Sequence, residues 1–179
     1  MNAIDHLLRP FPTHGIPPAL RLTARIARCS RSLAIDFELH GNVADLTLPA
    51  RSEAPARRHG LWEESCFEFF LAAPHSYSYF EFNLSPSGHW NLYRFTGYRQ
   101  GMREVEAFES LPFATRLRPD SFLLSLALDL DPLFETVHPL DVAISAVIRH
   151  HDGGTSWWAL AHPAAQPDFH HRDGFTLRV

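Results

Sequence analysis

Residues 61–101 carry the pattern that decides the fold, and they read LWEESCFEFFLAAPHSYSYFEFNLSPSGHWNLYRFTGYRQG. Aromatic and aliphatic side chains recur at every second position, which is typical of strands that bury one face. Polar side chains sit between them, and several residues here are of kinds that bind ligands: Glu64, Glu68, Glu81, Asn83, Trp90 and Arg94. A polar sheet face edged by aromatic rings is more often a recognition surface than an accident. The stretch therefore points to a binding domain more clearly than to an enzyme.

A plainer interpretation of the same face is a solvated outer surface. Glu68 or Glu81 would then pair with Arg94 across neighbouring strands, and such exposed pairs contribute about 1 kcal/mol or less. The alternation itself is the same in both interpretations.

Similar alternation and turn residues predict further strands on either side of this stretch. Strands are expected at residues 20–28, 32–40, 62–71, 77–84, 90–98, 114–117, 121–129, 141–149, 156–162 and 174–178. Residues 85–88 have the composition of a hairpin turn, and residues 104–109 that of one short helical turn. Residues 1–18 contain four prolines and are expected to be an extended lead-in. About ten short strands without a long amphipathic helix predict an all-β fold, an antiparallel β-sandwich resembling a jelly roll.

Composition narrows the class of protein. A length of 179 residues suits one domain that spans residues 1–179. The net charge of −4 argues against nucleic acid or an anionic membrane as a partner. No apolar run approaches the about 18 residues of a membrane span, and the first residues lack the basic start and apolar run of a secretory signal. We therefore expect a cytoplasmic protein, whose oligomeric state the sequence leaves open.

The two cysteines give little evidence of an oxidising compartment. Cys29 and Cys66 allow a single pairing, and one possible pair is a weak indication of a disulfide. Cys66 lies inside an expected strand and is interpreted as a buried thiol.

Three of the four tryptophans are candidate stacking platforms for a ligand. Trp62 lies at the start of an expected strand, Trp90 begins another, and Trp157 follows a Gly-Gly turn. The competing interpretation is core packing, because tryptophan is highly buried on average. Trp157 and Trp158 are adjacent, so in a strand they point to opposite faces and at most one of them belongs to the core.

Two groups of residues suggest chemistry beyond simple binding. Glu68 and Glu81 form a possible acid–base pair for glycoside hydrolysis, because neighbouring strands can separate two carboxyl groups by the required distance. The C-terminal segment holds His162, Asp168, His170, His171 and Asp173, which are residue types that bind zinc and other divalent metals. Their spacing matches no strong metal motif, and local hydrogen bonding that pins the segment is the simpler interpretation.

The residues also resemble a known family. The runs LWEESCFEFFLA and YFEFNLSPSGHWNLYRFTGYRQGMR, with the end SWWALAHPAAQPDFHHRDGFTLRV, are similar to DOMON-like proteins, and more distantly to family 9 carbohydrate-binding modules. The resemblance covers about residues 60–179 and is carried by Trp62-Glu63, Glu68, the turn from Ser85 to Gly88, Trp157, Phe169-His170 and Phe175.

This resemblance implies a β-sandwich that binds a ligand, which is a sugar in some relatives and haem in other DOMON domains. Haem would need a methionine–histidine pair, and Met102 has no evident histidine partner in the sequence. Our prediction is therefore a non-catalytic domain that binds a small carbohydrate or sugar derivative, without metal or cofactor. Its predicted binding residues are Trp62, Glu64, Glu68, Glu81, Asn83, Trp90, Arg94, Trp157 and His170. The alternatives are an enzyme that uses Glu68 and Glu81, and a structural protein whose sheet face packs on another subunit.

Overall fold

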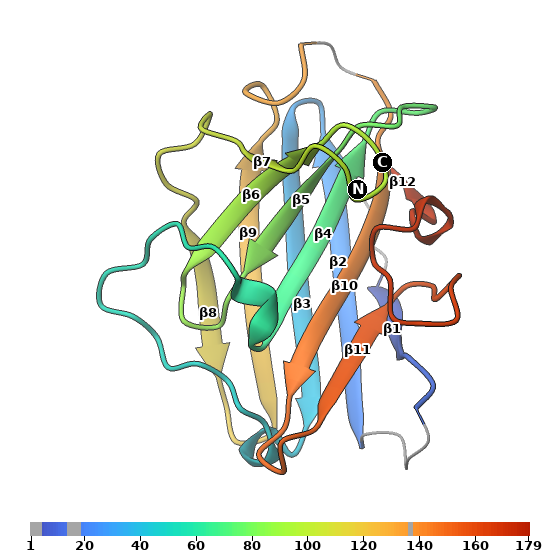
Figure 1. Ribbon diagram of the computed structural model, residues 1–179. Coiled ribbons are helices and arrows are strands. Elements are labelled where there is room, and N and C mark those ends of the chain that lie inside the picture. The colour runs from blue at the N-terminus through green and yellow to red at the C-terminus, as the bar shows by residue number, and fades with distance from the viewer. Residues whose placement is uncertain (1–4, 14–18, 136–137) are drawn as a thin grey trace.

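Two layers of antiparallel strands lie face to face (Figure 1). The computed structural model describes residues 5–13, 19–135 and 138–179. The front sheet contains β4 (Cys66–Ala72), β5 (Tyr79–Leu84), β6 (Trp90–Phe95), β7 (Arg103–Glu104), β10 (Asp141–Arg149), β11 (Thr155–Ala159) and β12 (Leu177–Arg178). The back sheet contains β2 (Leu20–Cys29), β3 (Ser32–Gly41), β8 (Phe113–Leu117) and β9 (Ser121–Asp129). The predicted β-sandwich is thereby confirmed, whereas the jelly-roll arrangement stays a prediction.

Strand β1 (Asp5–Pro10) belongs to both layers. Its first part, from Asp5 to Leu8, pairs with β2, and its last two residues pair with β11. The two sheets therefore form one hydrogen-bonded path from β7 to β8 that folds over on itself.

The core fills the space between the two sheets. Every second side chain of β4 points inward, where Phe67, Phe69 and Leu71 are fully buried. Phe67 bridges the layers, because its ring lies 5.3 Å from that of Phe37 on β3 and 5.2 Å from that of Phe122 on β9. Burial of rings of this size is the main favourable term in such a core.

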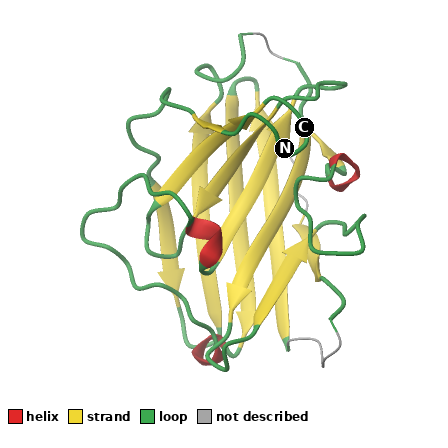
Figure 2. Cartoon of the chain, in the orientation of Figure 1, coloured by secondary structure: helices red, strands yellow, loops and turns green. Residues whose placement is uncertain are grey.

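Among the residues that the structure describes, helical structure is limited to three short 3₁₀ turns (Figure 2). They are η1 (Val43–Asp45), η2 (Leu61–Glu63) and η3 (Arg172–Gly174). In the described part of the chain, no helix has the length and apolarity needed to cross a membrane. Of the three, η2 matters for function, because it lies on the outer side of β4.

Three sequence predictions need correction. Residues 5–10, within the lead-in that was predicted to be extended, form the paired strand β1, because its one proline, Pro10, stands at the end, where a missing N–H is tolerated. Residues 104–109 are not helical: Glu104 pairs with Tyr93, and the Val105 N–H donates to the Leu92 carbonyl at 2.9 Å. The strand predicted from residue 62 begins at Cys66, because Gly60 (φ +77°) starts the η2 turn instead.

The two cysteines are free thiols. Cys66 is buried as predicted, and burial, with a smaller effect from the charge of Glu68, raises its pKa. Cys29 is exposed at the end of β2.

Candidate ligand-binding site

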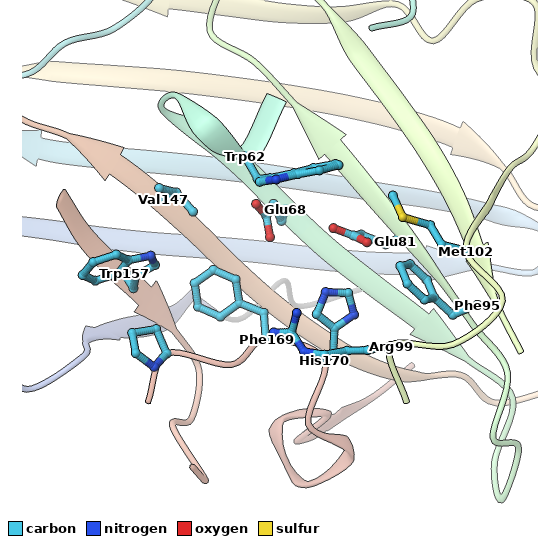
Figure 3. A pocket seen from close by; sticks show the side chains of 11 residues that line it. Trp62, Glu68, Glu81, Phe95, Arg99, Met102, Val147, Trp157, Phe169 and His170 are labelled. Carbon is cyan, nitrogen blue, oxygen red and sulfur yellow. The ribbon is translucent and has the colours of Figure 1, made fainter. Parts of the chain in front are cut away.

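A cavity of about 390 Å³ opens on the outer face of the front sheet. Figure 3 shows the side chains that surround it, which come from the sheet, from η2, from the loop after β6 and from the C-terminal segment. The eleven lining residues are Trp62, Glu68, Glu81, Phe95, Arg99, Met102, Val147, Trp157, Pro167, Phe169 and His170. This volume is in the range of small-molecule pockets.

Two glutamates form the floor of the pocket. Glu68 on β4 lies opposite Asn83 on β5, and Glu81 lies opposite Phe70, so the two carboxyl groups are diagonal neighbours on one face. The same strand alternation that sends phenylalanines inward sends these glutamates outward. Nevertheless both are buried, with exposed fractions of 3% and 4%.

Neither glutamate has a cationic hydrogen-bond partner. Glu81 accepts from the side-chain amide of Asn83 at 3.0 Å, and one oxygen of Glu68 accepts from the Ser145 hydroxyl at 3.5 Å. The other Glu68 oxygen, Oε1, is buried and has no hydrogen-bond partner. A buried polar atom that is left without a partner costs free energy, so this oxygen marks a place where a ligand atom would be stabilising.

Burial sets the protonation of both groups. Burial, with a smaller effect from the charge of Glu81, raises the pKa of Glu68 well above its usual range. Burial raises the pKa of Glu81 to about 7, against a weaker opposing effect of the Asn83 hydrogen bond. Strongly perturbed carboxyl groups in a cleft are typical of functional sites.

Trp62 on η2 forms one wall. Its ring lies 5.0 Å from the His59 ring and 5.9 Å from the Tyr93 ring, in edge-on contacts that fix its orientation. His59 is held in turn by the Tyr93 hydroxyl, 3.0 Å from its Nδ1. The short η2 turn thus presents an indole ring over the sheet.

The C-terminal segment forms the opposite wall. The ring of His170 lies 5.4 Å from Phe70 and 5.0 Å from Phe95, so the segment packs on the aromatic outer face of the sheet. Arg172 anchors it by donating to the carboxylate of Asp141 on β10 at 2.7 Å. The anchor returns residues 167–170 to the pocket although they are about 100 positions from β4 and β5 in sequence.

His170 is neutral and offers a donor. Burial, helped by the charge of Arg99, lowers its pKa to about 4. Its Nδ1 lies 2.8 Å from the Tyr79 hydroxyl, which also accepts from the Arg99 backbone N–H at 3.2 Å. Burial raises the pKa of Tyr79 to about 12, so the hydroxyl keeps its proton and donates it to Nδ1. The ring proton of His170 is then on Nε2, where it is available to a ligand.

Arg99 lines the same pocket, and its charge acts on both glutamates, but it already has a partner. Its guanidinium donates to Asp168 at 2.9 Å, and Asp168 also accepts from the Tyr98 hydroxyl. These contacts lower the pKa of Asp168, so the pair is ionised and neutral as a whole. The charge of Arg99 lowers the pKa of both floor glutamates, but the effect of burial is larger, and Arg99 forms no hydrogen bond with either of them.

The structure brings five of the nine predicted binding residues together at the pocket: Trp62, Glu68, Glu81, Trp157 and His170. The adjacent tryptophans divide as predicted, because Trp158 is 2% exposed in the core while Trp157 lines the pocket.

The other four do not line the pocket: Asn83 shares the outer face with Glu68 and Glu81, whereas the prediction that Trp90 and Arg94 share it needs correction. Trp90 points inward and is buried in the core, with the Arg57 guanidinium 4.2 Å from its ring centre. Arg94 shares the inward parity of Trp90 on β6, and at the sheet edge it is exposed beside a different cavity. Glu64 is exposed after η2. Asn83 is fully buried, and its amide group is occupied by Glu81 and by the Cys66 thiol.

The predicted binding residues did not include six of the lining residues, which are Phe95, Arg99, Met102, Val147, Pro167 and Phe169. The prediction extended a strand to residue 98, whereas β6 ends at Phe95 and a turn follows, closed by the bond from the Gln100 N–H to the Gly97 carbonyl. The two glycines that flank this turn were the available signal. No signal linked it to Asp168, which is 69 residues away in sequence.

The residues present do not form a metal centre or a good haem site. In the residues that the structure describes, no group of three or more histidine, cysteine, aspartate or glutamate side chains is placed to hold a metal ion. Met102 and His170 do line the same cavity, which the sequence did not reveal. The floor between them carries two carboxyl groups, however, which suit the hydroxyls of a ligand better than the apolar face of a porphyrin.

Comparisons with known proteins give a fold relationship. No protein-family model matches the chain, and no curated protein matches its sequence. A solved structure of a suggested carbohydrate-binding protein from Bacteroides uniformis superposes with a TM-score of 0.68 at 14% identity, covering 94% of this chain and 82% of that one. A family 9 carbohydrate-binding module from Caldicellulosiruptor kristjanssonii in complex with cellotriose superposes with a TM-score of 0.52 at 10% identity, covering 91% of this chain and 75% of that one. The chain shares the fold of these two proteins.

Proposed function

We propose that the pocket on the outer face of the front sheet binds a carbohydrate. The observation that carries the proposal is the combination of aromatic walls with a buried carboxyl oxygen, Oε1 of Glu68, that has no partner in the protein. Sugars present apolar C–H faces, which stack on rings, and hydroxyls, which need hydrogen-bond partners. A pocket with few polar groups among aromatic side chains meets both needs.

The polar groups of the pocket complement sugar hydroxyls. The glutamates accept hydrogen bonds, and the Nε2–H of His170 donates one. Trp62 and Trp157 supply ring faces on different sides of the cavity (Figure 3).

The structural neighbours support the proposal at the level of the fold. One is described as a suggested carbohydrate-binding protein and the other was solved with cellotriose. Their identities of 14% and 10% are too low to transfer individual residues, so the side chains of this pocket carry the site assignment.

The test is isothermal titration of the purified protein with mono- and oligosaccharides, after a thermal-shift screen that also includes haem. A ligand at 100 times its Kd stabilises the fold by about 2.7 kcal/mol, which gives a clear rise in melting temperature. We expect Glu68→Gln and Trp157→Ala to weaken the best sugar by at least about tenfold, which corresponds to about 1.4 kcal/mol.

Two other predicted residues provide matched controls. Glu64→Gln repeats the Glu68 substitution outside the pocket, and Arg94→Ala removes another predicted binding residue outside it; both should leave sugar affinity unchanged. If Glu68→Gln and Trp157→Ala fold normally and still bind every sugar as the unmodified protein does, the site assignment is wrong. A response to haem alone would replace the carbohydrate proposal.

One observation favours a second candidate, an enzyme acting on a sugar derivative. Glu68 and Glu81 are neighbouring carboxyl groups with raised pKa values in one pocket, as expected of a general acid and base. Release of nitrophenol from aryl glycosides measures this activity. Turnover that either glutamine substitution abolishes supports the enzyme, and sugar binding without any turnover excludes it for these substrates.

A further inference from the structure

The charges around the pocket do not balance. Arg99 and Asp168 neutralise each other across 2.9 Å, and His170 is neutral at pH 7 because burial lowers its pKa to about 4. The neutral donors Asn83 and Ser145 are the hydrogen-bond partners of the two floor glutamates. When both glutamates are ionised, the pocket therefore carries two buried negative charges, and the one positive charge on its walls, that of Arg99, is already paired with Asp168.

The other titratable groups that face the floor do not supply a positive charge. Tyr79 on β5, Tyr93 on β6 and Cys66 on β4 keep their protons at pH 7, because burial raises the pKa of each. An uncompensated carboxylate is costly in a buried position unless a cation or a proton joins it. A proton can take this place, because burial raises the pKa of Glu81 to about 7.

The geometry leaves room for a different cation. Figure 3 shows both carboxyl groups directed into the space between Trp62 on one side and Phe169 and His170 on the other. Oε1 of Glu68 is available there as an acceptor. Ring faces add to the attraction, because an aromatic face attracts an ammonium within about 6 Å of its centre, most strongly where water is excluded.

We propose that the ligand is an amino sugar with a free ammonium group, held between the carboxylates of Glu68 and Glu81. This inference rests on the proposed carbohydrate binding and specifies which class of sugar fits. A neutral sugar leaves the two carboxyl groups without a cation in direct contact, whereas an ammonium provides one together with three hydrogen-bond donors.

The test compares glucosamine with glucose and N-acetylglucosamine by isothermal titration at pH 7. The three share a ring, and only the first carries a free ammonium. We expect glucosamine to bind at least about tenfold more tightly than either neutral sugar. Because the ammonium displaces protons from the glutamates, its binding should release protons, seen as a dependence of the measured enthalpy on the ionisation enthalpy of the buffer. Affinity should fall about tenfold between pH 7 and pH 5.5 as the carboxyl groups retain those protons.

Variants separate the charge effect from general damage to the pocket. In Glu68→Gln and in Glu81→Gln, glucosamine should lose at least about tenfold more affinity than glucose does, and Glu64→Gln should leave both unchanged. Having two variants keeps the test valid if one of them fails to fold.

Failure of this inference is distinguishable from failure of the proposed function. If glucose or cellotriose binds as tightly as glucosamine, the amino-sugar inference is overturned and carbohydrate binding stands. If no sugar binds, or if tetramethylammonium binds in the absence of any sugar response, both are overturned.

Discussion

The two outer faces of this sandwich are built by the same alternation and yet differ in what covers them. On the back sheet, the outer polar residues remain in solvent: the Arg25–Asp5 pair has side-chain exposures of 49% and 56%. On the front sheet, Glu68 and Glu81 occupy equivalent outward positions but are almost fully buried. The difference comes from η2 and the C-terminal segment, which lie over the front sheet alone.

This comparison teaches that polarity and exposure are separate properties of a sheet face. The exposed polar residues on the back sheet are open to solvent, which can satisfy hydrogen bonds that their protein partners leave unmade. The same residue types on the front sheet have lost most of that water, so they depend on protein partners or on a ligand. A covered polar face is therefore the better indication of a binding site.

The largest expected effect tests whether a covered side chain on the outer face of the front sheet contributes as much stability as a core side chain. Phe70 points outward but is 0% exposed beneath His170 and Phe175. We expect Phe70→Ala to lower the free energy of unfolding by about 3–5 kcal/mol, as for a core phenylalanine. Urea denaturation measures the change. The control is Leu123→Ala on the outer face of the back sheet, which is only half-buried and should cost about 1 kcal/mol. Equal losses at the two positions would contradict the comparison.

The second-largest expected effect is on the pH dependence of stability, through ionisation of the buried Glu81 carboxyl group. The pKa of Glu81 is about 7 in the folded protein against a usual value of 4.5, so ionisation opposes folding as the pH rises between these values. Glu81→Gln should leave stability unchanged near pH 4 and raise it by about 3 kcal/mol at pH 8, because glutamine cannot ionise.

The matched control for this charge is on the back sheet. Glu38 is half-exposed beside His40, and Glu38→Gln should change stability by less than about 0.5 kcal/mol at either pH. Chemical denaturation of Glu81→Gln and Glu38→Gln near pH 4 and at pH 8 measures both changes in stability. A pH-independent response of Glu81→Gln would show that the front face is solvated after all.

The smallest effect tests the anchor of the cover. Asp141 is 14% exposed at its side chain and accepts from both Arg172 and Arg178. Asp141→Asn should lower the free energy of unfolding by about 1–2 kcal/mol. Asp5→Asn, in the exposed pair of the back sheet, should cost about 0.5 kcal/mol or less. If thermal denaturation shows a larger loss of stability for Asp5→Asn than for Asp141→Asn, the C-terminal segment is held by its aromatic contacts alone.

The sequence predicts the local part of this architecture well. Alternation places β2, β3, β9 and β10 within a residue or two of their observed bounds, and it separates Trp157 from Trp158. These features depend on neighbours along one strand, so a pattern of period two is enough to find them.

What the sequence does not predict is contact between distant segments. The return of Phe169 and His170 to the sheet depends on Arg172 meeting Asp141, 31 residues away. The burial of Glu68 depends on that cover, so the composition of the strand alone left a solvated face equally possible. Trp90 shows a different error. It was predicted to bind ligand because tryptophan often does so, although its position in the alternation of β6 directs it into the core.

Strand β1 bears on the protein's resistance to aggregation. By pairing with both β2 and β11, it occupies backbone donors and acceptors that would otherwise form two free sheet edges on the same side of the molecule. Unpaired edges of this kind recruit strands from other chains. A truncation that removes residues 1–10 would therefore do more than weaken the fold: it would leave two open templates side by side, and self-association in place of simple unfolding is its expected consequence.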